Sequence, residues 1–80
     1  MIAKVYITLK NGVLDPQGQA VQKSLHLMGF QGLSSVRLGK YIEVCFEDSI
    51  SKEKAKEELK SMCEKLLANT VIEDYRIELP

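Results

Sequence analysis

Hydrophobic and polar residues alternate along the middle of the chain, from Val36 to Phe46. Apolar side chains occupy the even positions of this stretch, and Lys40 is the single charged residue among them. An alternation of period two is typical of a β-strand with one buried face. The pattern does not shift at Gly39, so a two-residue hairpin there would place apolar and charged residues on the same face. We therefore predict one long strand bent near Gly39, and keep a split into two strands as the alternative.

This strand is longer than the domain that could hold it. Its eleven residues would extend over roughly 36 Å. A globule of 80 residues has a radius of gyration of about 12 Å and a diameter of about 30 Å. A chain of this length also buries only about 60–65% of its surface on folding, so association would add to a small core. We therefore expect a homo-oligomer in which two chains complete each other's sheet.

The N-terminal part predicts a strand followed by a helix. Residues Ala3 to Lys10 alternate in the same way and end at Asn11-Gly12, a turn sequence. Asp15 can cap a helix that begins with proline, and this helix should run from Pro16 to about Met28. Gly29 can then adopt the left-handed conformation that ends a helix. The apolar stripe predicted to face the core consists of Ala20, Val21, Ser24, Leu25 and Met28.

The C-terminal part repeats this order in reverse. A second helix is predicted over Lys52 to Ala68, capped by Ser49 or Ser51 and stopped by Asn69 in the left-handed conformation. The last strand should span Val71 to Leu79, and a glutamate among its apolar positions indicates a sheet edge or a subunit contact. The core stripe of the second helix is predicted to be Ala55, Leu59, Met62, Cys63 and Leu66.

These elements predict a single α+β domain over residues 1–80. The order is β-α-β-α-β, or a ferredoxin-like β-α-β-β-α-β if the chain turns at Gly39. Each helical connection is long enough to return the chain onto one face of a sheet. We therefore expect a two-layer sandwich whose antiparallel sheet is completed by dimerisation.

Composition argues against two classes of partner. The chain has 11 basic and 11 acidic residues, so its net charge is zero and it lacks the basic excess of nucleic-acid-binding or membrane-surface proteins. No apolar run approaches the length that spans a bilayer. The N-terminus enters a strand pattern directly, without the features of a signal peptide. We therefore expect a cytoplasmic protein whose Cys45 and Cys63 are reduced.

Reactive residues do not converge on a catalytic site. His26 is the single histidine and lies on the polar side of the first predicted helix. Cys45 and Cys63 are far apart in sequence and have no clustered histidines, so they do not match a metal site. The five glycines do not form a phosphate-binding loop. We predict no catalytic residue, no metal and no cofactor in this chain, and an interaction module is the simplest interpretation.

Two segments resemble a known family. These are V-L-D-P-Q-G at Val13 to Gly18, which precedes the first helix, and C-E-K-L-L-A-N-T-V-I-E-D-Y at Cys63 to Tyr75. Together with the central V-R-L-G-K-Y-I-E-V they are similar to PurS, the small subunit of phosphoribosylformylglycinamidine synthase. Length and element order agree with this family, so the resemblance covers essentially the whole chain.

The resemblance implies a non-catalytic partner in the fourth step of purine biosynthesis. In this family, a synthetase subunit of the PurL type uses ATP and Mg²⁺, and a glutaminase subunit of the PurQ type releases ammonia from glutamine. PurS dimers help to assemble these two subunits, and a role in ammonia transfer is a further expectation. Whether the chain forms dimers or tetramers is left open.

Thirteen residues are candidates for the subunit contacts that the resemblance implies. In the Asp15 to Gly18 segment and near the C-terminus, the residue types are more specific than helix capping or strand formation requires. Helix capping alone also explains Asp15 and Asn69. The candidates around Gly39 would lie near the dimer seam. The set is Asp15, Pro16, Gln17, Gly18, Arg37, Gly39, Lys40, Tyr41, Asn69, Thr70, Asp74, Tyr75 and Arg76.

Two other hypotheses compete with this interpretation. A small ferredoxin-like module of the ACT type would bind an amino acid or nucleotide at a dimer interface near the loop from Asn11 to Gly18. Calorimetry with such effectors would distinguish it, because only a sensor should bind them tightly. A standalone enzyme would require activity in the purified chain.

Overall fold

The computed structural model describes residues 1–80. Its elements follow the order β-α-β-α-β, as the sequence predicts, so the chain does not form the six-element alternative. A π-helical turn extends the second helix without a break. The elements are β1 (Ile2–Leu9), α1 (Pro16–Leu27), β2 (Gly39–Cys45), α2 (Lys52–Met62), the π-helical turn η1 (Cys63–Leu67) and β3 (Glu73–Glu78).

The three strands form one antiparallel sheet in the order β2-β1-β3. Val5 of β1 lies opposite Ile42 of β2 and Ile77 of β3, so apolar residues of all three strands meet on one face. The predicted antiparallel sheet is confirmed, and so is the edge position of the last strand. The strand at the centre is β1, whereas the Val36–Phe46 stretch supplies the other edge.

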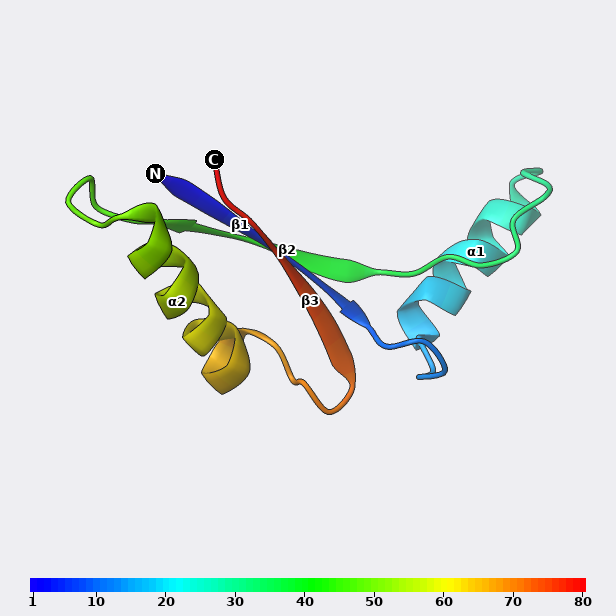
Figure 1. The fold of residues 1–80 in the computed structure, drawn as a ribbon. Helices are drawn as coiled ribbons and strands as arrows, with labels where there is room; N and C mark the ends of the chain where they lie inside the picture. Colours follow the sequence, from blue (N-terminus) through cyan, green and yellow to red (C-terminus); the bar gives the residue numbers. More distant parts are fainter.

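The core lies between this apolar face and α2 (Figure 1). Ala3, Val5 and Ile7 of β1 are almost fully buried, because α2 and η1 cover this face of the sheet. Leu59 and Cys63 contribute the other side and have no exposed surface. The sheet, α2 and η1 therefore make one compact unit, which we call the body.

Helix α1 projects away from the body, together with the segment that returns from it (Figure 1). We call α1 and residues 28–35 the arm, and residues 36–38, which lead back into β2, the returning segment. The predicted burial of the α1 stripe is wrong within a single chain, because Val21 is 36% and Met28 72% exposed. The molecule measures 51 × 24 × 15 Å, and its radius of gyration is 16.1 Å rather than the roughly 12 Å of a globule of this length.

The central strand is shorter than predicted. Strand β2 begins at Gly39 and its pairing with β1 runs without interruption from Thr8–Gly39 to Ile2–Cys45. Residues 36–38 have no strand partner in this chain, because β1 ends at Leu9 and turns away. The chain does not reverse at Gly39, so the predicted hairpin alternative is excluded.

The end of the second helix also differs from the prediction. The wider π-helical turn η1 changes the helical register, so Leu66 is 83% exposed while Leu67 packs against the core. Asn69 does not adopt a left-handed conformation, since no residue other than glycine has a positive φ. Its side chain instead accepts a hydrogen bond from the Val71 backbone N–H at 3.2 Å. Strand β3 consequently begins only at Glu73.

The predicted helix starts are confirmed. Asp15 caps α1, with Pro16 at the first helical position, and Ser51 rather than Ser49 caps α2. Gly29 follows α1 with a φ of +98°, a conformation that favours glycine. Neither helix combines the length and the apolar character that crossing a membrane would require.

Candidate functional site

One carboxylate connects the arm to the returning segment, next to the point where that segment enters β2. Asp15 Oδ1 accepts a hydrogen bond from the Gly18 backbone N–H at 2.9 Å, and Oδ2 accepts one from the Leu38 N–H at 3.0 Å. The first bond caps α1, and the second reaches the residue that precedes β2. These two hydrogen bonds hold the pKa of Asp15 below its ordinary value of 3.8, and the nearby Arg37 guanidinium contributes in the same direction.

The helix and the returning segment approach each other closely at this point. Gly18 is buried, and a Cβ atom at its position would overlap the carbonyl oxygen of Val36 and lie 2.7 Å from Asp15 Oδ2. Glycine is therefore required for the contact itself. Further along the arm, Gln22 Nε2 donates to the carbonyl oxygen of Leu33 at 3.0 Å.

Two side chains make further contacts at the base of the arm, one from the returning segment and one from β2. The Arg37 guanidinium donates to the carbonyl oxygen of Leu9, the last residue of β1. Lys40 Nζ lies 3.8 Å from Glu73 Oε2, which links the two edge strands. A cavity of about 210 Å³ opens here, lined by Ile7, Thr8, Leu9, Asp15, Gln17, Leu38, Gly39, Lys40 and Glu73.

The open face of the sheet carries a cross-strand aromatic group. Tyr6 lies opposite Tyr41 in β2 and Arg76 in β3. The two rings have centroids 5.2 Å apart, and the Arg76 guanidinium carbon lies 4.3 Å from the Tyr6 ring centroid. Desolvation, followed by the charge of Glu43, raises the pKa of Tyr41. Tyrosine and arginine are enriched in protein interfaces, so this group is a candidate contact surface.

The remaining candidates gather at the end of α2. The Tyr75 hydroxyl donates to Glu64 Oε1 at 2.9 Å, and this hydrogen bond raises the pKa of Tyr75. The Asn69 N–H donates to Glu73 Oε1 at 2.7 Å. A polar cavity of about 340 Å³ lies beside these contacts, lined by Lys10, Glu64, Thr70, Glu73, Asp74 and Tyr75.

The predicted contact residues therefore fall into three groups rather than one surface. The residues from Asp15 to Gly18 meet Arg37, Gly39 and Lys40 at the base of the arm. Tyr41 and Arg76 lie on the open sheet face, and Asn69, Thr70, Asp74 and Tyr75 lie near η1. Tyr75 and Arg76 are separated because neighbouring strand residues point to opposite faces.

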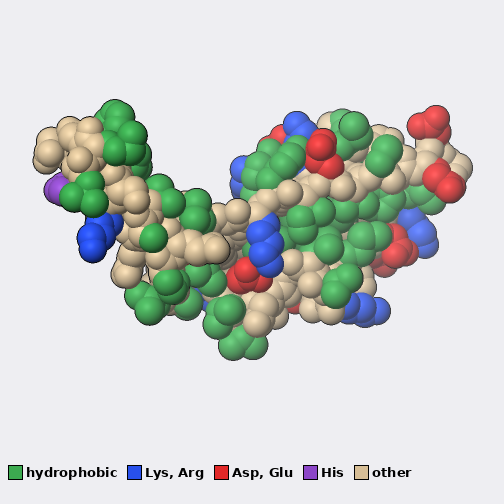
Figure 2. Space-filling view, turned by 180° about the vertical axis from the view of Figure 1, so that it is seen from behind, with side chains coloured by type: hydrophobic (Ala, Val, Ile, Leu, Met, Phe, Trp, Pro, Cys, Tyr) green, Lys and Arg blue, Asp and Glu red, His purple; other side chains and the backbone are tan.

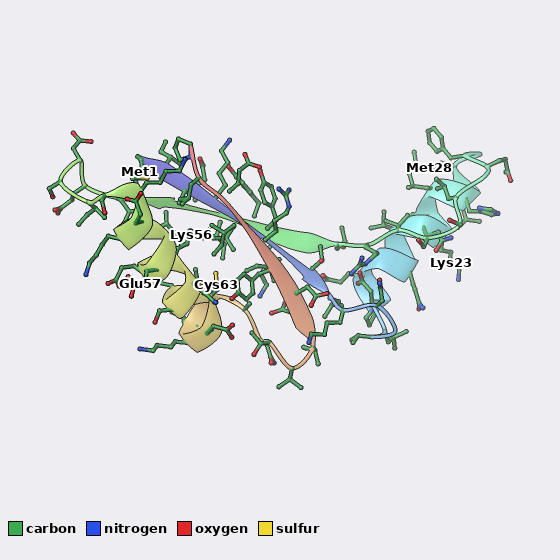
Figure 3. The ribbon with its side chains drawn as sticks, in the orientation of Figure 1. Met1, Lys23, Met28, Lys56, Glu57 and Cys63 are labelled. Atoms are coloured by element: carbon green, nitrogen blue, oxygen red, sulfur yellow. The ribbon has the colours of Figure 1, made fainter.

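The exposed apolar tip of the arm was not predicted, because Met28 was expected to be buried and its apolar neighbours were not singled out. Leu27, Met28 and Phe30 are 80%, 72% and 54% exposed, although all three are large and apolar. Met28 lies at the far end of α1 (Figure 3), and apolar side chains reach the surface of the arm in several places (Figure 2). The sequence did contain a signal for this tip, because these three large apolar residues lie on either side of Gly29, where the helix ends.

The single histidine and the two cysteines differ in exposure. His26 and Cys45 are exposed, whereas Cys63 is fully buried between α2 and the sheet (Figure 3). Burial raises the pKa of the Cys63 thiol, which opposes formation of a nucleophilic thiolate. No group of three or more His, Cys, Asp or Glu residues is arranged to hold a metal ion.

Together, the fold and these surfaces define a small α+β protein with an extended arm that leaves large apolar side chains exposed. Comparison with known proteins makes this more specific. The sequence profile of the PurS family, described as phosphoribosylformylglycinamidine (FGAM) synthase, matches residues 2–80. The PurS subunit of this synthase from Bacillus subtilis is 56% identical over 77 residues, which cover 95% of this chain and 88% of that protein.

Solved structures support the same relationship. The crystal structure of PurS from Methanocaldococcus jannaschii has a TM-score of 0.84 and 45% identity, covering 96% of this chain and 92% of the other. A chain in the PurLQS structure from Thermotoga maritima has a TM-score of 0.81 and 34% identity, covering 98% and 96%. The chain described here belongs to the PurS family. This membership favours the PurS hypothesis over an effector-sensing module.

Proposed function

We propose that this chain is the small subunit of a phosphoribosylformylglycinamidine synthase, and that it helps to assemble the synthetase and glutaminase subunits. The observation that carries this proposal is the likeness, over 98% of the chain, to a chain in the PurLQS structure from Thermotoga maritima. The related protein from Methanocaldococcus jannaschii is described as one of the subunits of formylglycinamide ribonucleotide amidotransferase in the purine biosynthetic pathway.

Under this proposal the chain itself does not catalyse a reaction. The synthetase subunit of the PurL type would bind ATP and Mg²⁺, and the glutaminase subunit of the PurQ type would supply ammonia. This chain would hold the two in an arrangement that lets ammonia pass between them. The buried Cys63, with its raised pKa, agrees with a structural rather than a nucleophilic role.

The assembling unit is proposed to be a homodimer, or a tetramer built from such dimers. The arm supports this, because Val21 and Met28 of its apolar stripe are exposed in the single chain and the molecule extends over 51 Å. In the proposed dimer the arm of each copy packs on the other copy, and residues 36–38 extend the shared sheet. Large apolar side chains such as Val21 and Met28 would then leave water.

Reconstitution with the larger subunits tests the proposed function. Synthetase and glutaminase subunits from the same genome should form product from glutamine only when this chain is added. They should depend on it much less when ammonium salt replaces glutamine. Product formation from glutamine without this chain would contradict the proposal.

The candidate contact residues can be tested in the same assay. We expect Tyr75→Ala and Arg76→Ala to weaken co-elution of the three subunits and to lower the rate with glutamine. Lys56→Ala is a suitable control, because Lys56 is an exposed residue of α2. If both variants assemble and turn over like the wild type, Tyr75 and Arg76 are not contact residues.

A further inference from the structure

The arm is attached to the body by polar contacts rather than by packing. Gly18 is the only buried residue of α1, so no apolar side chain of this helix anchors it against the sheet. The arm meets the body at its base, where the outgoing chain and the returning segment pass each other (Figure 1). A helix without packed side chains can change its orientation easily unless specific bonds hold it.

Asp15 is the residue whose side chain bonds both chain segments that meet at this base. Its carboxylate accepts from Gly18 in the first turn of α1 and from Leu38, 23 residues later, where the chain enters β2. The Arg37 guanidinium, next to Leu38, is bonded in turn to the carbonyl oxygen of Leu9 in β1. The path from α1 to the sheet therefore runs through two charged side chains, Asp15 and Arg37, and the backbone groups they bind.

We infer that the Asp15 carboxylate is the positioning group of a joint that sets the angle between the arm and the body. Gly18 completes the joint, because it lets the helix approach the Val36 carbonyl closely enough for both carboxylate oxygens to be used. This inference goes beyond the proposed function, since it concerns the conformation of the chain itself. In the proposed dimer the joint would orient the arm for its packing on the second copy.

Substitution by serine separates the two hydrogen bonds of Asp15. Serine is also a preferred helix N-cap, so its hydroxyl can still accept from the Gly18 N–H. It has one oxygen instead of two and a shorter side chain, so it cannot also accept from Leu38. The Asp15→Ser variant should therefore keep α1 and lose the joint.

The experiment compares Asp15→Ser with Asp48→Ser in the full-length protein by NMR. Asp48 is an exposed residue between β2 and α2, so this control makes the same change in charge. In Asp15→Ser we expect the Leu38 amide to exchange about 10- to 100-fold faster, the effect of losing a hydrogen bond to a charged group. Residual dipolar couplings of α1 should also change relative to those of β1. Amide exchange of β1 should remain that of the wild type.

Two results would overturn the inference. Unchanged α1 couplings in Asp15→Ser, with or without faster Leu38 exchange, would mean that the arm is oriented by something else, such as its packing on a second copy. Equal acceleration of exchange in β1 and at Leu38 would mean that Asp15 supports the whole fold rather than a joint.

A second variant tests the joint without altering Asp15. Gly18→Ala favours the helix, because alanine has the higher helix propensity, but its Cβ would overlap the Val36 carbonyl oxygen. We expect altered α1 couplings and faster Leu38 exchange, with α1 itself intact. Couplings identical to those of the wild type would contradict the role given to Gly18.

Discussion

The two helices of this protein are similar as sequences and opposite as structures. Helix α1 has 12 residues and α2 has 11, and each is amphipathic and begins with a side-chain cap. Helix α2 buries Ala55 and Leu59 completely, whereas the only buried residue of α1 is Gly18. An amphipathic pattern thus indicates that a helix face will be covered, but it does not indicate which chain covers it.

The same difference assigns separate tasks to the body and the arm. The body encloses its apolar residues within one chain and provides the internal stability of the fold. The arm presents apolar residues that this chain leaves in water, which fits the association proposed above. Substitutions in the two regions should therefore be detected by different measurements.

The largest expected effect concerns the body. Leu59→Ala should lower the free energy of unfolding by about 2–5 kcal/mol, because it leaves a cavity in a fully buried site. Leu66→Ala, in the adjoining π-helical turn, is the matched control and should change it by less than about 0.5 kcal/mol, since Leu66 is 83% exposed. Urea denaturation at a fixed protein concentration measures both. Equal losses at the two positions would mean that η1 is not arranged as described.

The second prediction concerns the arm. Val21→Asp should weaken self-association more than about 30-fold, because burying a carboxylate in an apolar contact costs at least about 2 kcal/mol. Gln19→Asp adds the same charge to α1 away from the apolar stripe and should leave association near the wild-type level. Sedimentation equilibrium measures the dissociation constants. If Val21→Asp associates like the wild type, the stripe does not form the dimer contact.

The smallest expected effect is a pH dependence at the base of the arm. The pKa of Asp15 is lowered in the folded protein, so the ionised carboxylate stabilises the fold above the ordinary aspartate pKa of about 3.9. This contribution should disappear as the pH falls through the lower, folded-state pKa. The charged groups facing Asp15 are Arg37 and, across the cavity, Lys40 and Glu73.

Acid titration of stability measures this effect. The difference in free energy of unfolding between the wild type and Asp15→Ser should be constant from pH 7 to about pH 5 and shrink below about pH 4. Asp48→Ser is the control at pH 7, where it should change the free energy of unfolding by less than about 0.5 kcal/mol because Asp48 is an exposed residue. A difference for Asp15→Ser that persists unchanged at low pH would exclude the ionised carboxylate as its cause.

Features determined by neighbouring residues could be predicted from the sequence. Local chemistry begins the two helices at Asp15 with Pro16 and at Ser51, and it ends the first helix at Gly29. The structure has all three of these features. The predicted alternation of side chains between the two faces of the central strand is also confirmed over β2, because the period of a strand depends only on backbone geometry.

Features that depend on distant parts of the chain, or on an unusual backbone conformation, could not be predicted. The length of β2 depends on where β1 turns away, and the exposure of Leu66 depends on a π-helical turn with no clear signature in the sequence. The bonds from Asp15 to Leu38 and from Arg37 to Leu9 join residues 23 and 28 positions apart. The sequence marked Asp15 and Arg37 as candidates, but it could not show that they act at the same place.

The two outer strands of the sheet have a consequence for behaviour in a crowded solution. Both β2 and β3 present an unpaired backbone edge, which is a template for fibre growth between molecules. Four of the six residues of β3 are charged, and β2 carries Lys40 and Glu43. Such charges act as gatekeepers against stacking of strands. Newly made copies can therefore remain dispersed until they meet their intended neighbours.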